Sequence, residues 1–275
     1  MRVFCYGCIY LFVCFTIEAQ QSRADSSLAS GNLSLAALQY EEQAFFEKDL
    51  VNQSEWLLRK SYCYKALGQY ENAISTLTRI RRTPNDSLNQ LVGYEIILAN
   101  YLAGHYEASY QAVLKQKLRS KELSKEILYL EALNLLALNR WQDAKELVQK
   151  HEALMVISSE EVELLFEGKM EPKKISKAFN LSMLLPGVGQ MYAGYFGKGL
   201  FSGAVQAGLV GASVYSLING YFFTGTFSGV AFFYTFYFGG ARYAKELAVK
   251  NNSKRSKELS RKLLKAKKKT LAEGL

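Results

Sequence analysis

The side chains that most often carry catalysis or bind metals are few and scattered in this sequence. The two histidines, His105 and His151, lie far apart, and three of the four cysteines lie within the first 14 residues. A structural zinc site needs four Cys or His ligands at close spacing, and Cys63 alone cannot supply them. The sequence therefore predicts no metal site and no internal disulfide framework.

Acidic side chains give no stronger sign of an active site. Glu160, Glu161 and Glu163 are adjacent carboxylates, but this spacing is typical of a solvated helix turn. The sequence contains no Ser/His/Asp or Cys/His set, P-loop or HExxH motif. We therefore predict a protein that is not an enzyme and that has no cofactor.

The net charge of +9 comes from one end of the chain. Residues 242–275 contain 12 Lys and Arg against 3 Glu, which equals the excess of the whole protein. The segment contains no interleaved aromatic or Gly-Arg pattern of the kind that nucleic-acid-binding segments show. Because an uncharged block precedes it, we predict a basic helical tail that contacts anionic membrane lipid, and no nucleic-acid partner.

The N-terminus has the pattern of a secretory signal peptide over residues 1–19. Arg2 precedes an apolar run from Val3 to Ile17, and Ile17 and Ala19 occupy the −3 and −1 positions of a cleavage site. An uncleaved anchor and a lipoprotein modified at Cys14 are the alternatives. A cleaved signal would place the following residues outside the cytoplasm.

A six-residue pattern recurs four times between residues 25 and 149, at intervals of 37, 36 and 35 residues. Periods of this length indicate stacked helical hairpins. Gly or Asn at the first position suits a left-handed turn, the large third residue fills the hairpin, and the small sixth residue lies where two helices cross. The pattern comprises Gly31, Leu33 and Ala36; Gly68, Tyr70 and Ala73; Gly104, Tyr106 and Ser109; and Asn139, Trp141 and Ala144.

These Gly-x-Tyr-x-x-Ala cores resemble the tetratricopeptide repeat (TPR) family, with the first repeat departing at Leu33. The resemblance implies an α-solenoid of about four hairpins over residues 20–167 that binds a protein or peptide in a concave groove. The eighth position of each unit is small in that family, and Ile97 departs from this rule, whereas Ala24, Ser61 and Ala132 obey it. The candidate groove residues are Arg59, Lys60, Glu95, Asn100 and Asn134.

The array is predicted to end with one more helix. Ser158 and Glu161 form a capping-box pattern that starts an apolar helix, and Gly168 is a plausible end. Because solenoids need a cap on the exposed apolar end, we assign this role to that helix. Residues 168–177, with Pro172 and several lysines, are the predicted linker.

Residues 178–241 form an apolar block, which we predict to be a membrane domain of two or three spans. Gly199–Asn219 and Gly220–Ala241 are uncharged segments of 21 and 22 residues, long enough for a hydrocarbon core of about 30 Å. Their small-xxx-small spacings, such as Gly199 with Gly203, favour close helix packing and a homo-oligomer. A buried hairpin of a soluble domain is the alternative.

The segment Ala178–Ala193 is apolar but contains Pro186 and two glycines, so it could span with a kink, re-enter or lie in the interface. With three spans in a bacterial inner membrane, the repeats lie in the periplasm and the basic tail in the cytoplasm, as the positive-inside rule requires. Two spans would put both on one side. The three-span arrangement accounts for the charge distribution, and the two-span arrangement is the alternative.

The same segment carries a Pro-Gly-x-Gly-Gln-x-Tyr-x-Gly motif. It resembles small bacterial membrane domains of the TM2 type, and that resemblance implies no biochemical activity. We interpret the motif as a tight turn at the membrane whose one polar amide must find a partner. Its residues are Pro186, Gly187, Gly189, Gln190, Tyr192 and Gly194.

These features predict an all-α protein in five parts, namely a signal peptide, a repeat domain, a linker, a membrane domain and a tail. Its expected function is that of a membrane-anchored scaffold for protein–protein interaction in the cell envelope. The alternative is an accessory factor for membrane-protein insertion or envelope biogenesis, in which the spanning block is the active part.

Overall fold

The computed structural model describes residues 23–119, 124–155, 157–168 and 170–273, and every regular element in these ranges is a helix. The predicted signal peptide lies outside them. The chain forms two compact units that divide between Asn134 and Leu135. This division falls within a helix of the fourth repeat, whereas the sequence placed the end of the repeat domain at residue 167.

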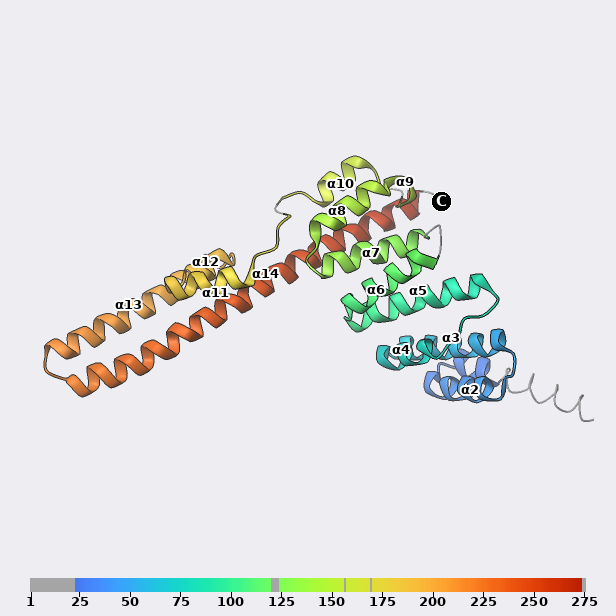
Figure 1. Cartoon of the computed structure of the whole chain (residues 1–275), viewed down its shortest axis with the longest axis horizontal. Coiled ribbons are helices and arrows are strands. Elements are labelled where there is room, and N and C mark those ends of the chain that lie inside the picture. The colour runs from blue at the N-terminus through green and yellow to red at the C-terminus, as the bar shows by residue number, and fades with distance from the viewer. Residues whose placement is uncertain (1–22, 120–123, 156, 169, 274–275) are drawn as a thin grey trace, which may run out of the picture. The chain divides into compact units, whose positions relative to one another are not determined.

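Unit 1 is a series of antiparallel helix pairs (Figure 1). A short helix over residues 23–29 pairs with α2, α3 pairs with α4, and α5 pairs with α6; α7 then begins the fourth repeat. The bounds are α2 Leu33–Phe46, α3 Leu50–Ala66, α4 Tyr70–Thr78, α5 Asp86–Ala103, α6 Tyr106–Arg119 and α7 Lys125–Ala137.

Each of the four repeats turns at the residue that begins the recurring pattern. The backbone φ angles are +79° at Gly31, +71° at Gly68, +82° at Gly104 and +60° at Asn139. This left-handed conformation is open to Gly and tolerated by Asn. The second helix of each pair starts two residues later, at Leu33, Tyr70, Tyr106 and Trp141.

The small positions of the repeats lie at the helix crossings. Ala36, Ala73, Ser109 and Ala144 are fully buried, as are the four residues at the eighth position. Ile97 does not open the third hairpin, because the Ser109 hydroxyl packs close enough to donate a hydrogen bond of 2.8 Å to the Ile97 carbonyl oxygen. The larger residue therefore fits where the family pattern has a small one.

Unit 2 contains the end of the repeat region and the apolar block. Ser158 forms the predicted capping box with Glu161 at the start of α10, and α10 packs against α8 and α14. The bounds are α8 Trp141–Lys150, α9 Glu152–Met155, α10 Ser159–Leu165, α11 Ile175–Leu184, α12 Val188–Tyr192, α13 Phe196–Ile218, η1 Thr224–Ser228 and α14 Gly229–Glu273.

The longest element is α14, a single helix of 45 residues. Its first part lies beside α13, the next part packs against α11 and α12, and the last part reaches α10 (Figure 1). The predicted basic tail is therefore not a separate element, because it continues α14 and one of its faces is buried against unit 2. The buried residues of that face include Ala244, Leu247, Ala248, Asn252, Ser256, Leu259 and Leu263.

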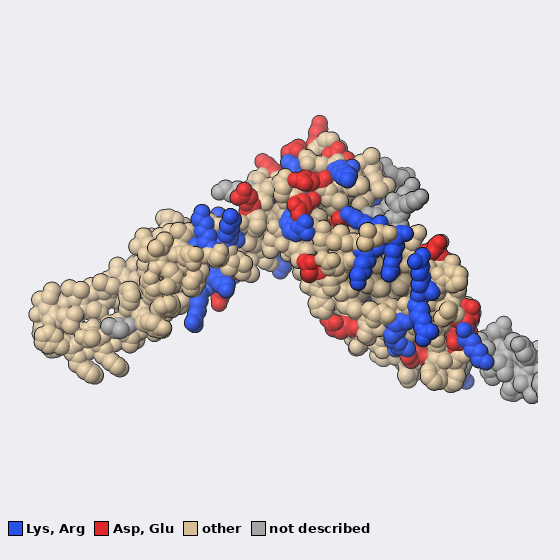
Figure 2. All heavy atoms as spheres, viewed as in Figure 1, with Lys and Arg blue, Asp and Glu red and all other residues tan. Residues whose placement is uncertain are grey.

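Among the described residues, α13 is the helix that is long and apolar enough to cross a membrane by length and composition. It pairs with η1 and the first part of α14, and we call residues 196–241 the apolar hairpin. In Figure 2 this end of unit 2 shows neither basic nor acidic side chains, and basic side chains gather where it meets the rest of the unit.

The predicted third span, Ala178–Ala193, does not form. Helix α11 has 10 residues and ends at Leu184, and the chain then reverses so that the five residues of α12 pack back on α11. Ten helical residues extend about 15 Å, half of the roughly 30 Å hydrocarbon core. Pro186 and Gly187 end the helix before it could cross.

Candidate functional site

Ion pairs join successive repeats within unit 1. Arg79 makes a bidentate contact with Glu41 at 2.7 and 3.0 Å and so links the first repeat to the second. Lys65 bonds Glu95 between the second and third repeats. Lys117 lies 2.5 Å from the buried carboxylate of Glu131 between the third and fourth repeats. The charged groups thus connect neighbouring hairpins along the array.

The five predicted groove residues all have partners within unit 1. Two of them pair with acidic groups of the first repeat, Arg59 with Asp25 at 3.1 Å and Lys60 with Glu41 at 2.6 Å. Glu95 bonds Lys65, Asn100 donates to the Ile96 carbonyl oxygen at 2.8 Å, and Asn134 donates to the Ser109 hydroxyl at 2.8 Å. These contacts show that the five side chains take part in packing between and within repeats; their role in a groove stays a prediction.

The ion pairs shift the pKa values of the groups they contact. Hydrogen bonds from Arg79, together with the pairing to Lys60, lower the pKa of Glu41 to about 2. Burial, with the nearby carboxylate of Glu95, raises the pKa of Tyr62 to about 12. These groups hold one charge state near neutral pH, which suits a structural role.

The Pro-Gly-x-Gly-Gln motif is a packing junction in unit 2. Gly187 has φ +94°, and a Cβ there would lie 2.1 Å from the carbonyl oxygen of Gly199 on α13. A Cβ at Gly189 would lie 1.9 Å from the carbonyl oxygen of Ala178 on α11. Only glycine lets α12 approach both backbones, so the motif specifies how α11, α12 and α13 fit together.

The other motif residues join α12 to its surroundings. Gln190 Nε2 donates a hydrogen bond of 3.1 Å to the Gly240 carbonyl oxygen on α14, and the Tyr192 hydroxyl accepts one of 3.1 Å from the Lys174 backbone. Gly194 leaves room for Asn251, whose Nδ2 donates to the Ala193 carbonyl oxygen at 2.8 Å. The predicted partner for the amide of Gln190 is therefore the backbone of α14.

Lysines and tyrosines gather at this end of the apolar hairpin. The Lys173 and Lys177 ammonium groups lie 4.8 and 5.4 Å from the ring centre of Tyr192. The Lys198 ammonium lies 5.4 Å from the Tyr195 ring and 5.1 Å from the Tyr243 ring. Such pairs are typical of the boundary between hydrocarbon and water. The tip of the hairpin, residues 219–223, contains no charged residue.

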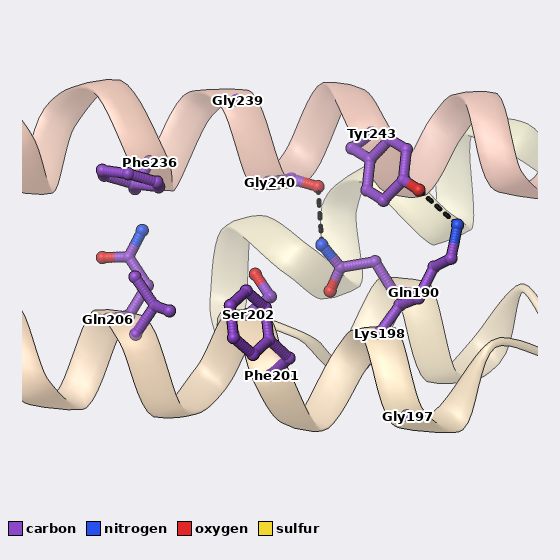
Figure 3. A pocket seen from close by; sticks show the side chains of 11 residues that line it. Gln190, Gly197, Lys198, Phe201, Ser202, Gln206, Phe236, Gly239, Gly240 and Tyr243 are labelled. Atoms are coloured by element: carbon purple, nitrogen blue, oxygen red, sulfur yellow. Dashed lines mark hydrogen bonds between the residues drawn. The ribbon is translucent and has the colours of Figure 1, made fainter.

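A cavity of about 490 Å³ opens between α13 and α14, with α12 behind it (Figure 3). Phe201, Val205 and Phe236 supply much of its wall. Lys198 is the one charged residue among the described residues that line it, and its ammonium donates a hydrogen bond to the Tyr243 hydroxyl. The remaining lining residues are small or polar: Gln190, Gly197, Ser202, Gln206, Gly239 and Gly240.

Two buried amides face this cavity without full hydrogen bonding. Gln190 is 1% exposed and Gln206 is 4% exposed. The Oε1 atoms of both have no hydrogen-bond partner among the described residues. Figure 3 shows both amide groups between α13 and α14. The cavity has a positive charge at Lys198, two amide groups further in, and an apolar wall. It can therefore accept an amphiphilic molecule.

The last part of α14 is joined to the fourth repeat within unit 2. Trp141 Nε1 donates a 2.9 Å hydrogen bond to the Ser256 hydroxyl, which itself donates to the Leu136 carbonyl oxygen at 2.6 Å. The buried side chain of Asn252 also bonds both backbone groups of Lys173, at 2.8 and 3.0 Å. The predicted linker is therefore held against α14 at Lys173.

This junction decides one question of topology. Trp141 and Ser256 touch, so both lie on the same side of any bilayer that the apolar hairpin crosses. The expectation of periplasmic repeats with a cytoplasmic tail rested on a third span over Ala178–Ala193, where the structure has two short helices instead. The two-span alternative is compatible with the contact.

Comparisons with protein-family models, with curated proteins and with solved structures find no match for this chain. The resemblance to TPR and TM2-type domains therefore stays a prediction from the quoted residues.

Sequence reasoning missed Ser256 and Gln206. Ser256 lies among lysines in a segment of solvated composition, and no local pattern marks its contact 115 residues away. Gln206 had a signal, since it is the one amide in the uncharged segment before Asn219. A lone polar side chain in such a segment usually faces a partner or a cavity.

Proposed function

We propose that this protein is a non-enzymatic scaffold in which a TPR-like array, anchored at a bacterial inner membrane, binds a protein partner. The single observation that carries the proposal is the continuity of α14. The first part of this helix forms one arm of the apolar hairpin, and a later part buries Ser256 against the last repeat. A repeat hairpin held this way has a defined attachment to the membrane, which a flexible tether would not provide.

We further propose that repeats and tail both face the cytoplasm. Within about 20 residues of the hairpin's charged end, the range over which the positive-inside rule operates, Lys and Arg outnumber Asp and Glu on both chain segments. The uncharged tip is then the part that crosses. A cleaved export signal over residues 1–19 would instead place repeats and tail in the periplasm, against this charge distribution.

Affinity capture tests the scaffold role. The full chain and a variant that lacks residues 23–119 are captured from detergent-solubilised membranes. The deletion ends before α7, so the contact of Ser256 with the Leu136 carbonyl oxygen is preserved. We expect a partner that the full chain retains and the variant loses. Identical partner sets for the two proteins would contradict the proposal.

The second candidate is an accessory role in membrane-protein insertion or envelope biogenesis, with the apolar hairpin as the active part. The observation that favours it is the pair of amide oxygens, Oε1 of Gln190 and Gln206, that line an apolar cavity without a hydrogen-bond partner among the described residues. Replacement of both by Leu should then abolish the cellular phenotype, even though the repeats are intact. A fully active double variant would rule this candidate out.

A further inference from the structure

The cavity between α13 and α14 has three features that together restrict what can occupy it. Its volume of about 490 Å³ lies within the roughly 300–1,000 Å³ of typical small-molecule sites. One end carries the exposed ammonium of Lys198, and the two buried amides lie along its length. The occupant must therefore have an anionic end and hydrogen-bonding groups next to an apolar part.

The buried amides show that an occupant would stabilise the site. A buried polar atom without a hydrogen bond costs on the order of 1–3 kcal/mol. The Oε1 atoms of Gln190 and Gln206 are both in this condition among the described residues. An occupant with hydroxyl groups relieves the cost, because a hydroxyl can donate to these acceptors. An acyl chain alone would leave both oxygens unpaired.

The positions of Lys198 and Gln206 on α13 set the order of charged and polar groups along the cavity. Lys198 and Gln206 are eight residues apart, or about 12 Å at a rise of 1.5 Å per residue. Figure 3 shows Gln190 and Tyr243 near the Lys198 end and Gln206 near Phe236. The cavity is thus charged at the end near the lysine–tyrosine cluster, polar behind it and apolar along its wall.

We propose that this cavity binds one anionic phospholipid with a hydroxylated headgroup, of the phosphatidylglycerol class. Its phosphate contacts the Lys198 ammonium and the Tyr243 hydroxyl. Headgroup hydroxyls donate to Gln190 Oε1, an ester carbonyl oxygen accepts from the amide nitrogen of Gln206, and an acyl chain lies along Phe201 and Phe236. Tyr243 is the one residue of the basic segment 242–275 among the described residues that line this site, and the proposal does not depend on the scaffold function.

A transmembrane helix of another protein fits the cavity less well. A helix has its backbone donors paired within itself, so it brings no free backbone donor to the unpaired Oε1 atoms of Gln190 and Gln206. A helix also offers no anion to Lys198 unless it carries an acidic side chain. A lipid supplies both the narrow apolar chain and the phosphate.

Native mass spectrometry of the full-length protein tests the proposal. The protein is released from nanodiscs made of equal parts phosphatidylglycerol and phosphatidylcholine. We expect one retained phosphatidylglycerol. Gly239→Leu places a side chain in the cavity where a Cβ meets no atom within 4 Å, and Gly211→Leu is the matched control, since its Cβ is equally unobstructed on the outer face of α13. Gly239→Leu should lower retention about tenfold or more, a loss of one or more good contacts, and Gly211→Leu should not change it.

Lys198→Gln gives a second readout that does not depend on filling the cavity. It should reduce the preference for phosphatidylglycerol over phosphatidylcholine about fivefold, the share expected of one cation near an anionic lipid. Lys177→Gln, which lies in the same lysine–tyrosine cluster but not in the cavity, should leave the preference unchanged.

Three results would overturn the proposal. Equal retention by Gly239→Leu and Gly211→Leu would mean that the lipid lies elsewhere on the hairpin. Displacement of the lipid by inorganic phosphate alone would mean that Lys198 binds only an anion. A photo-cross-linker at position 239 that captures a polypeptide instead of a lipid would show that the occupant is a protein segment.

Discussion

The Ser256 hydroxyl accepts a hydrogen bond of 2.9 Å from the Trp141 indole nitrogen, across 115 residues of sequence. The same hydroxyl donates to the carbonyl oxygen of Leu136 near the end of α7, which also accepts from the backbone N–H of Asn139 at 3.1 Å. One small side chain thus satisfies a buried donor of α8 and a buried acceptor of α7. The attachment of the last hairpin to α14 depends on this junction.

Replacement of Ser256 by Ala should loosen the junction without preventing the helices from forming. The indole nitrogen of Trp141 would then be buried without a partner, at a cost of about 1–3 kcal/mol. Amide hydrogen exchange over residues 250–263 should rise about 5- to 150-fold, the equivalent of that cost. Ser253→Ala, at an exposed position of the same helix, is the control and should exchange like the wild type.

Cysteine labelling tests the topology that this contact requires. Single cysteines are introduced at three exposed positions, Ser75 in the repeats, Ser253 in α14 and Asn219 at the hairpin tip; native Cys63 is buried and unsuitable as a probe. A membrane-impermeant maleimide should label Ser75→Cys and Ser253→Cys from the same side of the membrane. It should label Asn219→Cys from the opposite side. Labelling of the first two from opposite sides would refute the two-span arrangement.

Acid should weaken the link between the first two repeats. Contacts with Arg79 and Lys60 lower the pKa of Glu41 from its ordinary 4.5 to about 2. A group whose pKa is depressed on folding contributes its stability above the unfolded-state value and loses it as the pH falls through the folded-state value. The contribution is therefore complete near neutral pH and disappears between about pH 4.5 and pH 2.

Thermal unfolding of the full chain in detergent, measured over this pH range, checks the effect. Glu41→Gln should lower the unfolding temperature at neutral pH and reduce its fall in acid. Glu55→Gln, at an exposed position of α3, is the control and should follow the wild-type curve. A Glu41→Gln protein with an unchanged acid dependence would show that other groups dominate.

A methyl group at Gly189 should disrupt the junction of α11 and α12. The Cβ of Gly189→Ala would lie 1.9 Å from a backbone oxygen of α11, so the helices must separate. Overpacking of this kind costs typically about 1–3 kcal/mol, and we expect a lower unfolding temperature and a lower yield in detergent. Gly197→Ala meets no atom within 4 Å and should be as stable as the wild type or slightly more stable, given the better helix propensity of Ala.

Local sequence patterns were sufficient to predict the turns of the repeats and the helix cap that follows them. The recurring Gly or Asn predicted a left-handed turn at each of four places, and the structure has positive φ at Gly31, Gly68, Gly104 and Asn139. The capping box at Ser158 is also present. These features depend on residues a few positions apart, whose backbone preferences act within one turn of chain. The sequence determined them without reference to the rest of the molecule.

The partners of distant side chains were decided only by the tertiary structure. Composition described the residues after Arg242 as a solvated basic tail, whereas α14 buries one face against α10, α11 and α12. Four of the five predicted groove residues bond a neighbouring repeat, Asn100 bonds its own helix, and Gln206 faces a cavity with Gln190. A helix pattern states which residues share a face, and it does not state what lies opposite that face. That depends on contacts between segments more than 100 residues apart, such as Trp141 with Ser256, which no local rule contains.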